Sequence, residues 1–165
     1  MIDETGIVLT LTKLDELYSK TGDADMLKLY SKISVLEFCG WLEITMDEIV
    51  FSFSDRRLTL KDYKQECKEI VKETKGFVYD SHFRKLVYKI IGLYNLEKIE
   101  TKIEKDILIL NQETTLLWEE RVILAHTYTN PTRSFKTTPS TVLNGHLKKV
   151  LPILKTIQQE IDAIP

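Results

Sequence analysis

The chain of 165 residues contains only six glycines and four prolines, and every proline lies at or after Pro131. The first 130 residues therefore hold little that would interrupt a helix. The chain also has only two cysteines, Cys39 and Cys67, which are far apart and belong to no CxxC motif. This excludes a disulfide framework, and we expect both cysteines to be small buried side chains in a reducing compartment.

The sequence has no uncharged apolar run near the roughly 20 residues that cross a bilayer, so we expect no membrane segment. Its first residues, MIDETGIV, carry two acids where a signal peptide needs positive charge, which favours a cytoplasmic protein. The composition, 43% hydrophobic and 29% charged, is that of a soluble globular protein. We expect a single domain over residues 1–165.

Most kinds of catalytic site also lack their sequence signature. The chain has no glycine-rich phosphate loop, no GxSxG and no HExxH. Its three histidines, His82, His126 and His146, are 44 and 20 residues apart and have no acidic neighbours at the spacing of metal ligands. The sequence therefore predicts neither a metal site nor a cofactor.

What is present is helical periodicity along most of the chain. Asp23 is positioned to cap a long helix whose apolar stripe is expected to include Leu29, Ile33, Leu36 and Gly40. The segment FSFSDRRLTL after that helix is read as a loop, with a short hairpin or a frayed helix end as alternatives. Ser140 is expected to cap the last helix. The sequence predicts an all-α antiparallel bundle of four to six helices, at about 9–20, 24–51, 61–75, 82–94, 105–127 and 140–163.

One segment, WEERVILAHTYTNP, combines residue types that suit phosphodiester chemistry. Arg121 and His126 form an R-x4-H pair at the end of a predicted helix. Arginine donates a fork of N–H groups to a phosphate, and histidine can move a proton near neutral pH. Five residues turn an uninterrupted helix by about 140° relative to the partner, so the pair shares no face. The two converge only if the helix ends between them, if the arginine wraps round, or if two copies of the chain build the site.

The charge distribution supports an anionic ligand near this pair. The formal net charge is -2, but residues 121–159 contain six basic and no acidic side chains, which leaves -8 for the rest. Lysine and arginine side chains that bind phosphates release the counterions there, and this release contributes favourably to the binding free energy. We expect Arg133, Lys136, Lys148 and Lys149 to bind a polyanionic substrate. The alternative is an ordinary basic face on the last helix.

These residues resemble the HEPN domains (higher eukaryotes and prokaryotes nucleotide-binding). HEPN domains are helical bundles, often metal-independent ribonucleases, marked by an R-x4-6-H motif near the end of a helix. Here the motif is RVILAH, an upstream helix carries VLEFCGWLEITMDEIV, and a last helix follows a polar loop. The resemblance implies cleavage of RNA, with Arg121 stabilising phosphate charge and His126 acting as general base or acid. It also implies a homodimer in which two motifs meet, and a role in a prokaryotic toxin–antitoxin or antiviral system.

The residues around the motif refine what the resemblance implies. Val122 stands where active members commonly have a polar residue, and Thr127 where glycine is frequent. Tyr128 extends the motif to R-x4-H-x-Y, which resembles HEPN toxins whose tyrosine is modified by a nucleotidyltransferase-like antitoxin; the alternative is a tyrosine that covers the helix end. Glu43 is a candidate for orienting Arg121, or an ordinary inter-helix carboxylate. The alternative function is a catalytically inactive HEPN-like module that binds nucleotide, RNA or a protein partner.

Overall fold

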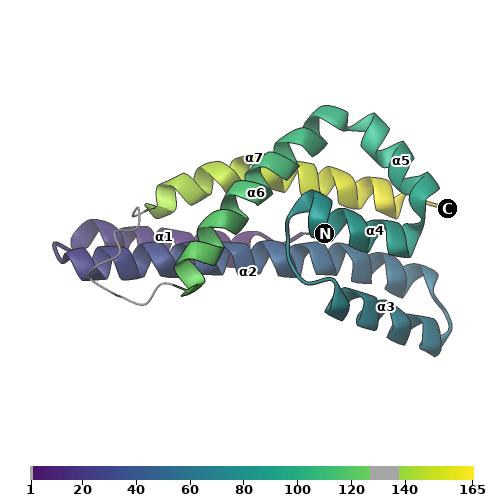
Figure 1. The fold of residues 1–165 in the computed structure, drawn as a ribbon, viewed down its shortest axis with the longest axis horizontal. Helices are drawn as coiled ribbons and strands as arrows, with labels where there is room; N and C mark the ends of the chain where they lie inside the picture. The colour runs from purple at the N-terminus through teal and green to yellow at the C-terminus, as the bar shows by residue number, and fades with distance from the viewer. Residues whose placement is uncertain (1, 127–137) are drawn as a thin grey trace.

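Two antiparallel helices begin the chain in the computed structural model, which describes residues 2–126 and 138–165. α1 (Thr5–Lys20) leads through a short turn into α2 (Ala24–Arg57). The Asp23 carboxylate accepts hydrogen bonds from the backbone N–H groups of Asp25 and Met26, at 2.8 and 3.3 Å, so the predicted cap is confirmed. At 1.5 Å per residue, the 34 residues of α2 extend about 51 Å. Figure 1 shows α2 running along most of the molecule.

Shorter helices cover one end of α2. α3 (Lys61–Glu73) packs against α2, and residues 74–78 then lead into η1, a π-helical turn (Tyr79–Phe83). α4 (Arg84–Ile91) continues directly from η1, and Gly92 separates α4 from α5 (Leu93–Lys102). Gly92 has φ +82°, a left-handed conformation that suits glycine and turns the chain sharply between the two helices. α3, α4 and α5 therefore gather at the same end of the molecule (Figure 1).

Two long helices complete the bundle. α6 (Glu104–His126) and α7 (Ser140–Asp162) pack against each other and against α2, and α7 also contacts α1. Figure 1 shows α6 crossing α2 obliquely. α6 also contacts η1 through its middle turns, where Thr114 and Asn111 accept hydrogen bonds from the backbone N–H groups of Tyr79 and Asp80. This arrangement positions the segment that carries Arg121.

The described residues confirm the predicted all-α class and contain no β-strand. One hydrophobic core joins the helices, and Cys39 and Cys67 are both free and buried in it, as predicted. Phe38, Leu42, Leu110 and Leu117 are among its fully buried members. Burying such a side chain contributes roughly 1.5–3 kcal/mol relative to leaving it in water.

Three predicted features of the fold are wrong. The described residues form seven α-helices and η1 where four to six helices were predicted, because Gly92 and the π turn divide the fourth helix and α5 was not expected. α2 continues through the predicted loop to Arg57, because Arg56 and Arg57 bond to Asp162 and Ile164 at the end of α7. Ser140 makes no cap bond; its hydroxyl pairs with that of Ser34 at 2.9 Å.

Candidate functional site

Arg121 lies on α6 and faces α2. Its Nη2 is 3.4 Å from Oε2 of Glu43, and 32% of its side chain is exposed against 22% for Glu43. This ion pair is longer than the about 2.8 Å of a strong charge-assisted hydrogen bond. The guanidinium carbon is 5.2 Å from the ring centre of Trp118 and 5.8 Å from that of Phe77, within cation–π range of both. The predicted role of Glu43 in orienting Arg121 therefore has a geometric basis.

Glu43 also connects Arg121 to the segment before η1. Its Oε1 accepts a hydrogen bond of 3.1 Å from the backbone N–H of Gly76. Gly76 has φ +124°, which only glycine adopts readily, and a Cβ at this position would lie 2.7 Å from a ring carbon of His82. Glycine is thus required twice, by the backbone and by the close approach of the imidazole. The carboxylate of Glu43 bridges α6 and this segment.

His82 belongs to the same cluster. Its ring lies 5.0 Å from that of Trp118, centre to centre, and its Nδ1 is 3.0 Å from the hydroxyl of Ser81. Burial lowers the pKa of His82 below its usual value, and the charges of Lys85 and Arg121 lower it further against the opposing effect of Glu43. The side chain is held in a π-helical turn, a feature that often occurs at functional sites.

Asp47, one turn after Glu43 on α2, has a perturbed carboxyl. Burial raises its pKa to about 6, and the nearby charge of Glu43 adds to the effect, whereas Lys75 acts against it. Clustered titratable groups with shifted pKa values occur preferentially at functional sites. We define the Arg121 cluster as five residues that come from α2, α6, η1 and the segment before η1: Glu43, Trp118, Arg121, His82 and Gly76.

His126, the other half of the predicted pair, is the last residue of α6. α6 is continuous from Arg121 to His126, so the helix does not end between them. Their positions on one helix are therefore turned by about 140° from each other. The side chain of His126 lies outside the described residues, as do the predicted site residues Tyr128, Arg133 and Lys136.

The remaining predicted substrate-binding residues, Lys148 and Lys149, lie on the surface of α7. Lys149 Nζ is 2.6 Å from Oε1 of Glu113, a nearly buried carboxylate on α6 whose Oε2 is 2.5 Å from Nδ1 of His146. Burial by itself raises the pKa of Glu113, but the bonds from Lys149 and His146 outweigh it and the net shift is downward. Lys149 therefore serves at least to neutralise a buried charge between two helices.

Of the four cations of the basic stretch that the structure describes, three are paired with acids from elsewhere in the fold. Arg121 pairs with Glu43 and Lys149 with Glu113, and a third cation, Lys155, lies 2.9 Å from the carboxylate of Glu4. The two residues of each pair are between 36 and 151 positions apart in the sequence. The excess of +6 in the sequence is thus not a continuous basic surface over the described residues.

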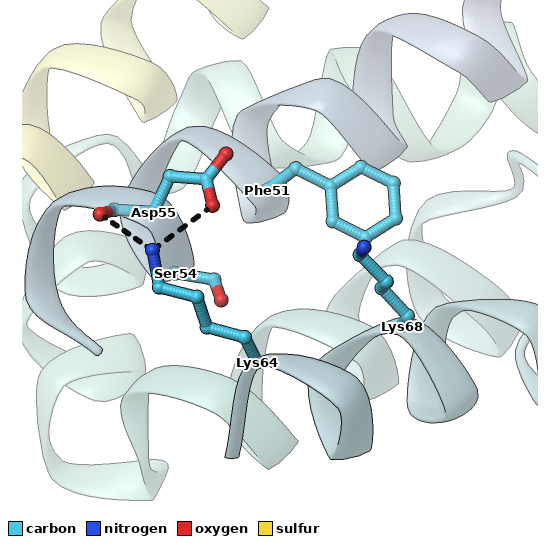
Figure 2. Close-up of a pocket in the computed structure, with 5 residues that line it drawn as sticks. All are labelled: Phe51, Ser54, Asp55, Lys64 and Lys68. Carbon is cyan, nitrogen blue, oxygen red and sulfur yellow. Dashed lines mark hydrogen bonds and ion pairs between the residues drawn. The ribbon is translucent and has the colours of Figure 1, made fainter. Parts of the chain in front are cut away.

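A cavity of about 350 Å³ lies between α2 and α3, beyond the Arg121 cluster along α2. Phe51, Ser54 and Asp55 of α2 line it together with Lys64 and Lys68 of α3 (Figure 2). The ammonium of Lys64 donates to the carbonyl and carboxylate oxygens of Asp55, at 3.3 and 3.4 Å. Because Asp55 neutralises the charge of Lys64, the cavity attracts an anion more weakly than two unpaired lysines would.

No protein-family model, curated protein or solved structure matches the chain. The geometry of the residues themselves therefore has to carry the functional argument. Among residues 2–126 and 138–165, no helix is long and apolar enough to cross a membrane. The same part of the chain brings together no group of three or more histidine, cysteine, aspartate or glutamate side chains suited to a metal ion.

Sequence reasoning did not find His82, Gly76 or Trp118. Arg121 and His82 are 39 residues apart and Arg121 and Glu43 are 78 apart, so no local spacing links them. The one local signal was Gly76, which follows a charged helix and precedes an aromatic pair, Phe77 and Tyr79. Gly76 directly follows the helix predicted for residues 61–75, but its contact with His82 depends on the tertiary fold.

Proposed function

We propose that this protein is a HEPN-like, metal-independent endoribonuclease of a prokaryotic toxin–antitoxin or antiviral system. The observation that carries the proposal is the setting of Arg121 in an all-helical chain. Its guanidinium is held by Glu43, Trp118 and Phe77 yet remains one-third exposed. A positioned, partly desolvated arginine that still reaches solvent is suited to bind a phosphate and to stabilise charge on it.

The proposed reaction uses the RNA's own nucleophile. A base removes the proton of the ribose 2′-hydroxyl, and the 2′-oxygen attacks the adjacent phosphorus, to which it is already close. Arg121 stabilises the negative charge that builds on the phosphate oxygens, and the 5′-oxygen leaves with a proton from an acid. The products are a 2′,3′-cyclic phosphate and a free 5′-hydroxyl. His126 is proposed as one of the two proton-transfer groups.

A homodimer is part of the proposal, because one α6 helix turns Arg121 and His126 away from each other. α6 has a second apolar side besides the one that it buries. Leu108, Ile109, Leu116 and Val122 on this side are 41–67% exposed, and their positions fall within about 140° of the helix circumference. Such a side suits packing against the same helix of a second copy. Position 126 lies on this side, about five full turns after Leu108, so the histidine position of each motif would be at that interface.

The test is RNA cleavage in EDTA by the purified wild type and the variants R121A and H126A. We expect cleavage by the wild type and a loss of at least 100-fold in each variant. R84A is the matched control, because Arg84 pairs with Glu100 at 2.6 Å with exposures of 39% and 23%, close to those of the Arg121 pair. Cleavage that survives in R121A, or is lost equally in R84A, contradicts the assignment of Arg121.

A second candidate function is a catalytically inactive module of the same kind that binds nucleotide, RNA or a protein partner. The observation in its favour is that Arg121, Lys149 and Lys155 already have carboxylate partners within the chain. In this case the wild type leaves RNA intact. Binding of a labelled single-stranded RNA, weakened by R121A and by added salt, separates this function from a chain that does not recognise RNA.

A further inference from the structure

RNA cleavage through the 2′-hydroxyl needs two proton transfers, one from the 2′-oxygen and one to the departing 5′-oxygen. The R-x4-H motif supplies one histidine per chain, and α6 turns it away from Arg121 by about 140°. A phosphate bound by Arg121 therefore requires another group for one of the two transfers. The described residues around Arg121 contain such a group, His82.

Shared neighbours link His82 to Arg121. Both side chains lie against Trp118, with the imidazole centre 5.0 Å and the guanidinium carbon 5.2 Å from its rings. Gly76 donates its N–H to Glu43, the partner of Arg121, and packs its unsubstituted Cα against the imidazole. His82 thus shares its neighbours with Arg121, although the two residues come from different elements, η1 and α6.

The surroundings of His82 favour the neutral imidazole that a base requires. Burial, followed by the charges of Lys85 and Arg121, lowers its pKa; the carboxylate of Glu43 and a hydrogen bond with the backbone of Val78 act in the opposite direction, and the net shift is downward. When Nδ1–H donates to the hydroxyl of Ser81, 3.0 Å away, the lone pair is on Nε2. His82 is only half-buried, and Arg121 is one-third exposed, so the cluster reaches the surface.

We propose that His82 is the general base of the Arg121 site. In this step Nε2 takes the proton of the 2′-hydroxyl, the 2′-oxygen bonds to phosphorus, and the bond from phosphorus to the 5′-oxygen breaks. The 5′-oxygen receives its proton from the acid, the role then left to His126 of a second copy, because α6 turns the chain's own His126 away from Arg121. This inference rests on the proposed ribonuclease function and assigns a residue outside the motif to the same site.

The experiment compares RNA cleavage in EDTA by the wild type, H82A, H82N and H146N. General-base catalysis contributes about 10²–10⁴-fold, so both His82 variants should cleave at least 100-fold more slowly. Free imidazole should restore part of the activity of H82A, because the deletion leaves a space between Gly76 and Trp118. The acidic limb of the wild-type pH profile should be absent from the residual activity of H82N. H146N should cleave like the wild type, and circular dichroism checks the fold of each variant.

Each other outcome overturns the inference in a distinguishable way. If H82A cleaves within threefold of the wild type while R121A and H126A are inactive, the ribonuclease proposal stands and His82 has no part in it. If H82A is slow but imidazole does not rescue it and H82N keeps the acidic limb, His82 has only a structural role. If the wild type does not cleave RNA, the proposed function and this inference fail together.

Discussion

Replacing Gly76 by alanine should both destabilise the protein and displace His82. At φ +124° a residue with a Cβ is strained, and such strain costs on the order of 1–3 kcal/mol. The new Cβ would also lie 2.7 and 2.8 Å from three atoms of the His82 ring. The ring has limited room to move because it packs against Trp118. We therefore expect G76A to lower the free energy of unfolding by about 2 kcal/mol or more.

Gly40 is the matched control, because it is also a glycine but neither its backbone conformation nor its surroundings disfavour a side chain. It lies inside α2, and a Cβ there meets nothing within 4 Å. Glycine within a helix costs about 0.5–1 kcal/mol relative to alanine. G40A should thus raise the free energy of unfolding by about that amount, so the two identical chemical changes should act in opposite directions.

Urea unfolding followed by circular dichroism measures both effects. For a chain of this size, 1 kcal/mol corresponds to a change in melting temperature of about 2–4 °C, so thermal unfolding gives an independent check. In a Trp41→Phe background, where Trp118 is the only tryptophan, fluorescence in the folded state should change with G76A and not with G40A, because only the first displaces His82 from the indole. Equal stabilities of G76A and the wild type would refute the reasoning, as would an unchanged His82–Trp118 contact.

Three further predictions follow from burial and charge. The pKa of Asp47 is raised to about 6 from 3.8, so the folded chain holds this proton more tightly and loses stability as pH rises between those values. D47N should therefore be more stable than the wild type at about pH 7.5, and this gain should vanish below the lower pKa in urea titrations at both pH values. Burial raises the pKa of Cys39 to about 12, and Cys67 is equally buried, so a thiol reagent at about pH 8 should label neither until the protein unfolds. Leu116→Asp, on the exposed side of α6, should give a monomer by sedimentation with an unchanged circular-dichroism spectrum and a lower melting temperature, because the dimer no longer stabilises the folded chain; a wild type that is itself monomeric contradicts the dimer.

The helical class could be predicted because its signals are local. Few glycines and prolines, apolar periodicity and the Asp23 cap each act over a few residues, and the structure confirms the all-helical class and the cap. The buried cysteines were likewise predictable from their type and from the absence of a motif. Such features depend on backbone preferences that neighbouring residues determine.

The apolar stripe predicted for α2 was only partly right. Leu29 is exposed, and the other three predicted positions are half-buried. The fully buried residues of this part of α2 are Val35, Phe38 and Leu42. α2 contacts α1, α3, α4, α6 and α7, so several of its sides are covered and no single stripe describes it. Small polar residues also enter the interface, as Ser34 does by bonding to the carbonyl of Tyr30 and to Ser140. Periodicity alone does not indicate how many neighbours a helix has.

The candidate site was predictable only in part, because its partners meet through tertiary structure. Arg121 was singled out from its residue type and its place in the motif, and its predicted contact with Glu43 is present in the structure. His82 and Gly76 depend on a π-helical turn and a left-handed glycine, which have no reliable sequence signature. The excess of positive charge in residues 121–159 did not predict a basic surface, because Arg121, Lys149 and Lys155 pair with acids that are distant in the sequence.

The most direct test of the central claim is the rate of RNA cleavage in EDTA by R121K, with R84K as control. Lysine keeps the positive charge of Arg121 but lacks the planar fork that binds a phosphate through two N–H groups and stacks on Trp118. We predict cleavage by the wild type and by R84K, and at least 100-fold slower cleavage by R121K. Wild-type cleavage that R121K reproduces, or no cleavage by the wild type, would contradict the claim that Arg121 acts on an RNA phosphate.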